Sequence, residues 1–432
     1  MFDLKANGTS VKTEIIAGAT TFFTMAYIMV VNPLILSGAG VPFEQSFTAT
    51  VIAAVIGTLL MGLVAKYPIA VAPGMGLNAY FTYSVVQGHE NLSYLEAFSA
   101  VFIAGILFLL LSLTPLRSRL IQIIPHNLKH AISAGIGLFI AFIGLRMSGI
   151  ITAHPENLVA LGDLHQPSAI LALTGLAITL ILLARKIKGA LFIGMILTGA
   201  IAYFAGMLTF NGIVSVPTLP EGILVWNPIE AAGDVISHSL YAVVFSFLLV
   251  TLFDTTGTVV GVAQQAGLMK DNKLPRSERA MLSDSVATVA GSMVGTSPTT
   301  AYIESAAGVG AGGRTGLTAV VVAVLFAVAA FFGPVIGAVS GLSAITAPSL
   351  IVVGCLMLGN VRGIEWNDFD EAFPAFIVIL TMPLTSSIAT GIALGFIAYP
   401  LMKVVSGKFR AVHPLMYFFA VLFILQLLFV PH

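Results

Sequence analysis

The stretch GTSPTTAYIESAAGVGAGG, residues 295–313, separates two long apolar runs with a proline, hydroxyl side chains, glycines and one carboxylate, Glu304. A second stretch, YPIAVAPGMGLNAYFTYSVVQG at residues 67–88, has a similar mixture of proline, glycine and small residues. In both, the apolar part is too short to cross about 30 Å of hydrocarbon at about 1.5 Å per residue. Each stretch therefore predicts a half-span helix preceded by a short extended strand, and the two should meet inside the protein.

The rest of the chain has the composition of a membrane protein. Its 432 residues are 58% hydrophobic and 9% charged, with a mean hydropathy of +1.01. Apolar runs of about 18 to 25 residues recur, which is the length that spans a bilayer. An outer-membrane barrel would instead show short alternating segments. The sequence therefore predicts an all-α polytopic membrane protein.

Several functional classes are disfavoured by composition and motifs. The 19 basic and 19 acidic residues balance, so no basic stripe indicates a nucleic-acid partner. The single cysteine, Cys355, excludes an intramolecular disulfide. The chain contains no HExxH, paired CxxC or GxxxxGK[ST] motif, which are the usual signs of a zinc enzyme or a P-loop ATPase. We therefore expect neither an enzyme nor a cofactor or metal, and transport would use an ion gradient.

About fourteen segments are expected, in two series of seven that a polar connection at 209–234 separates. The first series lies at roughly 14–36, 46–65, 78–88, 97–114, 129–148, 167–184 and 188–208, and the second at roughly 235–263, 278–294, 302–311, 314–338, 343–360, 370–386 and 387–405. Because seven is odd, two such repeats face opposite sides of the membrane, which is the inverted-repeat plan of secondary transporters. The repeats are 14–208 and 235–405, and the topology of a last apolar segment at 412–432 is left open.

Weak internal similarity supports the repeat. IAAVIGTLL in the second segment aligns with VATVAGSMV in the ninth. NAYFTYS, which begins at Asn78, aligns with TAYIESA, which begins at Thr300. This alignment makes Asn78 the counterpart of Thr300 and places Thr82 at the position of Glu304, so only the second repeat supplies the acid.

Lys and Arg residues predict the orientation in the membrane, because short cytoplasmic loops accumulate them. They fall in alternate connections, whereas the connections at 87–96, 151–166 and 209–234 contain none. The sequence therefore places the N-terminus inside. The basic residues used are Lys5, Lys12, Lys66, Arg117, Arg119, Arg185, Lys186, Lys188, Lys270, Lys273, Arg276 and Arg279.

Two acidic residues lie well inside predicted spans: Asp254 in LLVTLFDTTGTVVGV and Glu304 in the tenth segment. A carboxylate in hydrocarbon is costly, so such acids usually face a cavity or a partner and take part in transport or proton relay. The alternative is a structural acid that is hydrogen-bonded to neighbouring threonines. No intramembrane Lys or Arg stands out as a partner for either acid. Together with Asn78, the two carboxylates could bind the N–H groups of a planar heterocycle.

Six long motifs extend over essentially the whole chain: AGATTFFTMAYIMVVNP (17–33), APGMGLNAYF (72–81), AGIGLFIAFIGL (134–145), LFDTTGT (252–258), GTSPTTAYIESAAGV (295–309) and PAFIVILTMPLTSSIATGIALGF (374–396). The chain resembles the AzgA-like purine permeases of the nucleobase–cation symporter-2 superfamily, and most of all the bacterial guanine/hypoxanthine permeases.

The resemblance implies a core domain, about 14–114 and 235–338, and a gate domain, about 120–208 and 343–405. A purine would bind between them against the two half-span helices. The resemblance implies that Gly76, Asn78, Asp254 and Glu304 make the polar contacts to it. From the residues themselves we add Thr300, the counterpart of Asn78 in the internal alignment, and Phe81 as a candidate for stacking on the purine ring.

The resulting hypothesis is import of guanine and hypoxanthine, coupled to protons, across the inner membrane of a bacterium. Glu304 and Asp254 would bind purine N–H groups, and one of them would carry the proton. An adenine permease of the same family is the first alternative. A sulfate/bicarbonate-type anion transporter is the second, and it should place a basic residue or a bare helix N-terminus at the site. A homodimer is left open.

Overall fold

The computed structural model describes residues 2–429 except 90, 115–122, 157, 211, 218–221 and 270–273. Four basic residues used for the orientation, and the last three residues of the C-terminal segment, lie outside the described residues. The four are Arg117, Arg119, Lys270 and Lys273.

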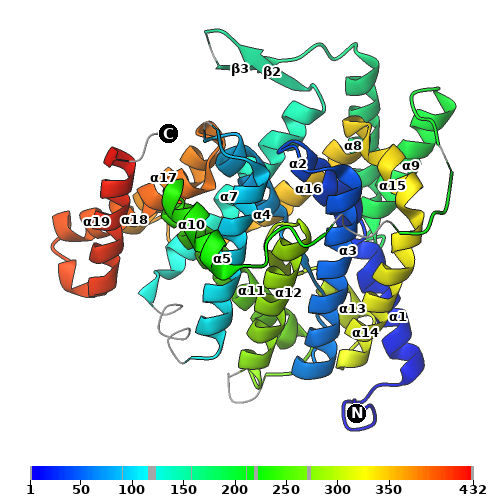
Figure 1. The fold of residues 1–432 in the computed structure, drawn as a ribbon, viewed down its shortest axis with the longest axis horizontal. Helices are drawn as coiled ribbons and strands as arrows, with labels where there is room; N and C mark the ends of the chain where they lie inside the picture. The colour runs from blue at the N-terminus through cyan, green and yellow to red at the C-terminus, as the bar shows by residue number, and fades with distance from the viewer. Residues whose placement is uncertain are drawn as a thin grey trace.

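Helices make up most of the structure (Figure 1). They are α1 (Val11–Met25), α2 (Ile28–Ser37), α3 (Phe43–Leu60), α4 (Met75–Ala79), α5 (Tyr94–Ser112), α7 (His126–Met147), α8 (Pro167–Ala184), α9 (Ala190–Phe204), α10 (Pro228–Ser237), α11 (Tyr241–Gln265), α12 (Ser277–Val294), α13 (Ser305–Gly310), α14 (Gly316–Ala329), α15 (Gly333–Ser340), α16 (Ser343–Leu358), α17 (Phe369–Leu384), α18 (Ile388–Val405) and α19 (Pro414–Phe429). The strands are β1 (Val71–Pro73), β2 (Ile151–His154), β3 (Leu158–Leu161) and β4 (Thr299–Ala301).

Nine helical segments of the described chain are long and apolar enough to cross a membrane. Of the other predicted segments, α9 and α17 have 15 and 16 residues, and α12 has 18 residues but is more polar. The half-span helices α4 and α13 have only 5 and 6 residues. A multi-pass membrane protein is therefore confirmed, while the number of spans remains a matter of proposal.

The two interrupted segments meet as predicted. β1 pairs antiparallel with β4, and Val71, Ala72 and Pro73 lie opposite Ala301, Thr300 and Thr299. α4 begins two residues after β1, and α13 begins four residues after β4. Each extended strand thus leads into a short helix, and the pairing brings together segments that are more than two hundred residues apart in the sequence.

The strand register places Ala72 opposite Thr300, whereas the internal alignment makes Asn78 the counterpart of Thr300. An antiparallel pair has a local twofold axis at each pair of opposed residues, so the register alone does not test that alignment. The correspondence of Asn78 with Thr300 therefore stays a prediction.

Flanking helices supply hydrogen bonds to this short ribbon. The Thr58 hydroxyl of α3 donates to the carbonyl of Val71 at 2.9 Å and accepts from its N–H at 3.0 Å. On the other strand, the Thr288 hydroxyl of α12 accepts from the N–H of Thr299 at 3.1 Å. Backbone that is neither helix nor full sheet needs such partners when it is buried away from water. Thr58 and Thr288 therefore have a structural role: they satisfy backbone groups of β1 and β4 inside the protein.

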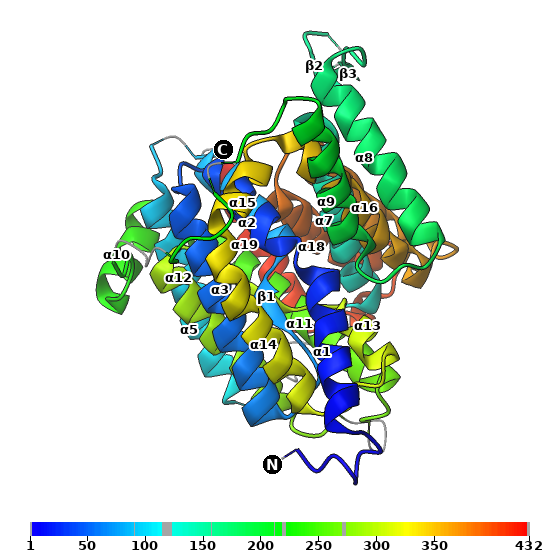
Figure 2. The ribbon, with the colours of Figure 1, turned by 90° about the vertical axis from the view of Figure 1, so that its right-hand side faces the viewer.

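The long helices surround the crossing strands. α12 packs against α3 and α5, α14 packs against α1 and α3, and α7 packs against α16 and α17. Figure 2 shows α1, α3 and α14 side by side, and both views place the β2–β3 hairpin and the N-terminus at opposite ends. The C-terminal helix α19 lies against α18, where the rings of Phe396 and Phe423 are 5.5 Å apart.

Candidate functional site

Asp254 lies in the middle of α11 and borders a small cavity between four helices. α4 contributes Gly76, α7 contributes Lys129 and Ile136, and α16 contributes Met357. The cavity has a volume of about 20 Å³, which is room for about one water molecule. In this conformation the predicted site is therefore closed to a two-ring heterocycle.

Thr300 and Glu304 lie close to Asp254. The side chain of Thr300 and the carboxylate of Glu304 are both near enough to the Asp254 carboxylate to interact with it electrostatically. The hydroxyl of Tyr27, in the break between α1 and α2, donates to Glu304 Oε1 at 2.6 Å. The fold thus brings three of the predicted site residues together, and Tyr27 fixes one oxygen of the second acid.

Asn78 has different surroundings, because its amide belongs to a buried polar network. Its Nδ2 donates to Asn32 Oδ1 at 2.9 Å. The amide of Asn32 donates in turn to the hydroxyls of Thr50 and Thr296, at 2.7 and 2.8 Å. In the described part of the chain, Asn78 Oδ1 has no hydrogen-bond partner. Asn78 therefore ties α4 to α2 and α3, and it retains one acceptor.

The two remaining predicted residues have packing roles. Phe81 is fully buried, stacks on Phe98 of α5 with ring centroids 4.6 Å apart, and is not among the described residues that line the cavity. At Gly76, an added Cβ would lie 2.3 Å from Cγ2 of Ile136. The missing side chain of Gly76 therefore allows α4 and α7 to approach closely beside Asp254.

Lys129 is a site residue that the sequence does not reveal. The sequence suggests no Lys or Arg as a partner for the intramembrane acids, yet Lys129 of α7 lines the same cavity as Asp254. Its Nζ is 5.6 Å from the ring centroid of Phe253. In the sequence this lysine stands at the first residue of an expected span, where an interfacial position is the usual one. Only the packing of α7 against α4 and α11 shows that it faces the site.

Asp284 is a second residue without an evident sequence signal. It is fully buried on α12, and its Oδ1 accepts from the Thr299 hydroxyl at 2.6 Å while its Oδ2 accepts from the Thr255 hydroxyl. These two threonines are chain neighbours of Thr300 and Asp254. Asp284 therefore binds the hydroxyl groups of the residues next to Asp254 and Thr300.

The site combines hydrogen-bonding groups of opposite kind. Ionised carboxylates accept hydrogen bonds, whereas an ammonium group only donates. Within the described ranges, no group of three or more His, Cys, Asp or Glu residues could hold a metal ion. The arrangement suits a ligand that carries N–H donors on one edge and a carbonyl acceptor on another.

Comparison with known proteins gives the family and several close relatives. A family profile described as a permease family matches residues 12–394. The chain is 62% identical over 429 residues to the guanine/hypoxanthine permease PbuO of Bacillus subtilis, covering 99% of both chains. It is 44% identical over 431 residues to the adenine permease AdeP of Escherichia coli, covering 100% of this chain and 96% of that one.

Solved structures show the fold. The transmembrane domain of a cyanobacterial bicarbonate transporter, BicA, superposes with a TM-score of 0.65 at 16% identity, over 88% of this chain and 97% of that one. The transporter SLC26A9 superposes with a TM-score of 0.65 at 14% identity, over 92% of this chain and 66% of that one. At such identities, the likeness extends to the fold and no further.

Proposed function

The chain belongs to the permease family that matches its residues 12–394, and on this premise we propose that it imports guanine and hypoxanthine together with protons. It is a multi-pass membrane transporter and not an enzyme. The proposal includes the cytoplasmic membrane of a bacterium as its location, with the N-terminus inside.

The observation that carries the proposal is the cluster of Asp254, Thr300 and Glu304 where the two broken segments cross. Guanine and hypoxanthine present ring N–H groups, to which carboxylates can bind by charge-assisted hydrogen bonds. Lys129 lines the same cavity, and its ammonium group can donate to the 6-oxo group of these purines. Adenine has a 6-amino donor at that position, so the set fits oxopurines better than adenine.

The anion-transporter alternative shares the fold but not the site. Anion transport needs a positive electrostatic potential where the substrate binds. Here Asp254 lines the cavity and Glu304 lies near it, so two carboxylates stand against the one ammonium group of Lys129. A second carboxylate would repel an anion from that position. The acids therefore favour a neutral ligand with N–H donors over sulfate or bicarbonate.

For the mechanism, we propose fourteen segments in a 7+7 inverted repeat, with a core of about 14–114 and 235–338 and a gate of about 120–208 and 343–405. The helix contacts support this division. The main packing partners of α12 and α14 belong to the core ranges, and those of α7 belong to the gate ranges. The cavity is bounded by α4 and α11 on the core side and by α7 and α16 on the gate side. Movement of one group against the other would open it to either side.

Uptake by cells that lack their own purine permeases tests the function. Labelled hypoxanthine, guanine and adenine are supplied with and without a protonophore to the wild type, Asp254→Asn and Glu304→Gln. The matched control is Glu156→Gln, which changes an exposed acid in the β2–β3 hairpin. We expect protonophore-sensitive uptake of the two oxopurines that either site variant abolishes and the control retains.

The outcomes separate the parts of the proposal. Uptake of adenine alone would refute the substrate assignment and leave the family unchanged. Oxopurine uptake that is insensitive to the protonophore would refute proton coupling. A correctly inserted wild type that takes up no purine would refute the function.

A further inference from the structure

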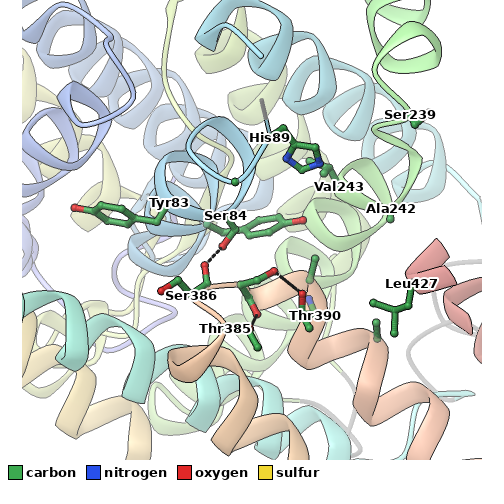
Figure 3. Close-up of a pocket in the computed structure, with 15 residues that line it drawn as sticks. Tyr83, Ser84, His89, Ser239, Ala242, Val243, Thr385, Ser386, Thr390 and Leu427 are labelled. Atoms are coloured by element: carbon green, nitrogen blue, oxygen red, sulfur yellow. Dashed lines mark hydrogen bonds between the residues drawn. The ribbon is translucent and has the colours of Figure 1, made fainter. Parts of the chain in front are cut away.

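The cavities that the described residues form differ in polarity. The cavity in Figure 3, of about 340 Å³, is lined by Ser84, His89 and Thr390 among other polar residues. A groove of about 450 Å³ lies elsewhere, where α9 faces α1 and α2 on one side and α14 and α15 on the other. Every described residue that lines this α9 groove is apolar. Its volume falls in the range of about 300–1,000 Å³ that is usual for small-molecule sites, so the groove can hold part of an apolar molecule.

The α9 groove opens toward the lipid. Phe23 of α1, Ile196 of α9 and Val328 of α14 line it, and these three residues are 49% to 53% exposed. α1 and α14 belong to segments that are long and apolar enough to cross a membrane. Half-exposed apolar side chains on such segments face hydrocarbon, and an empty hollow there would lose packing contacts. A hydrocarbon chain is therefore the expected filling.

Three basic residues precede α9. Arg185, Lys186 and Lys188 lie in the connection between α8 and α9, and all three are exposed. Residues 164–220 contain no Asp or Glu. In the described part of the chain, none of the three basic residues forms an ion pair. The basic connection therefore has three positive charges that no described carboxylate neutralises.

The basic connection adjoins the α9 groove directly. Gly189 follows Lys188, and a Cβ added to it would lie 3.1 Å from the carbonyl oxygen of Phe23. The rings of Phe23 and Phe192 both line the groove, and their centroids are 6.2 Å apart. Lys188 and Phe192 are only four residues apart in the sequence. Basic loops by themselves indicate only an orientation in the membrane, but here the charges stand at the end of an apolar groove.

We propose that the α9 groove binds one anionic phospholipid, with an acyl chain in the groove and the phosphate against the basic connection. Charge complementarity selects this occupant, because each Lys or Arg near the membrane surface raises the affinity for anionic lipid about fivefold. A zwitterionic phospholipid could fill the groove but would bring no net negative charge to its basic end. The inference goes beyond the proposed function and does not depend on the substrate. In the proposed division, the lipid bridges α9 of the gate and α1 and α14 of the core.

Quenching of an introduced tryptophan by brominated lipid tests this site in the full-length protein. The natural tryptophans are removed by Trp226→Phe and Trp366→Phe, and Phe192→Trp places a reporter in the groove. The protein is reconstituted in mixtures of phosphatidylcholine and phosphatidylglycerol, with brominated acyl chains on one lipid at a time. The two quenching curves give the affinity for phosphatidylglycerol relative to phosphatidylcholine. We expect a preference for phosphatidylglycerol of at least about tenfold.

Neutralisation of the basic connection provides the specific arm of the test. Replacement of all three basic residues by glutamine should bring the relative affinity close to one. Phe376→Trp, which changes an exposed ring on α17, reports on lipid at another surface and should show no such preference. The matched charge control should keep the full preference, because it changes three other exposed basic residues: Lys5→Gln, Lys12→Gln and Arg410→Gln.

Each other outcome would overturn the proposal. Equal quenching by the two lipids at Phe192→Trp would refute an anionic occupant, and an absence of quenching by either lipid would refute the groove as a lipid site. The proposal also fails if the glutamine triple variant keeps the preference, or if Phe376→Trp shows the same one. Unchanged quenching by phosphatidylcholine alone shows that the triple variant keeps the groove. None of these outcomes concerns purine uptake, so the proposed function is tested separately.

Discussion

Gly76→Ala is the substitution whose effect follows most directly from the geometry of the site. The new methyl group would lie 2.3 Å from Ile136 Cγ2, so α4 and α7 must move apart or their side chains must shift. Overpacking of this kind costs about 1–3 kcal/mol. Because the contact lies between the proposed core and gate, the cost falls on the closed conformation and changes its population roughly 5- to 150-fold.

The assay is the initial rate of hypoxanthine uptake at matched amounts of protein in the membrane. Gly76→Ala should lower the initial rate of hypoxanthine uptake at least about fivefold, which corresponds to the lower end of the overpacking cost. Ile136→Leu keeps the side-chain volume but removes the Cγ2 branch, so the double variant should recover most of the rate. Gly261→Ala is the control, because its Cβ meets no atom within 4 Å. Wild-type uptake by Gly76→Ala, or a double variant as slow as the single one, would refute the reasoning.

Three further substitutions test other contacts. Tyr27→Phe removes the donor to Glu304 Oε1 and should raise the KM for hypoxanthine about fivefold; an unchanged KM would show that Tyr27 does not orient the acid. Glu14→Gln weakens the carboxylate cap that accepts from the N–H and hydroxyl of Thr318 at 3.1 and 2.5 Å. It should destabilise the protein by about 1 kcal/mol, seen as a lower midpoint in a thermal-shift assay, and an unchanged midpoint would contradict this. Lys129→Met removes the ammonium group and should raise the KM for hypoxanthine at least about tenfold, without weakening inhibition by adenine; equal losses for both would exclude selection at the 6-position.

The sequence was informative about this protein where the bilayer restricts what a chain can do. Long apolar runs identify a multi-pass membrane protein, because about 20 apolar residues are needed to cross the hydrocarbon. Two runs too short to cross, with proline and glycine before them, predicted β1 with α4 and β4 with α13. Asp254 and Glu304 were identifiable because an acid in an apolar segment is costly and therefore rare.

Contacts between distant segments had no local signal. Lys129 has the sequence position of an interfacial lysine, and only the approach of α7 to α4 and α11 places it at the cavity that Asp254 also lines. Asp284 lies in a polar helix that hydropathy does not single out, and its role follows from two threonines on α11 and β4. Phe81 stacks in the core on a ring of α5, a neighbour that the sequence does not reveal.

The difference between what the sequence revealed and what it did not has a physical reason. The length, polarity and turn chemistry of one segment are properties of a short stretch of chain, so the sequence by itself determined the membrane class, the broken segments and the two acids. A strand register, the neighbour of a buried charge and the shape of a cavity depend on residues that come together only after the chain has folded. The tertiary structure therefore decided that Ala72 pairs with Thr300 and that Lys129 lines the same cavity as Asp254.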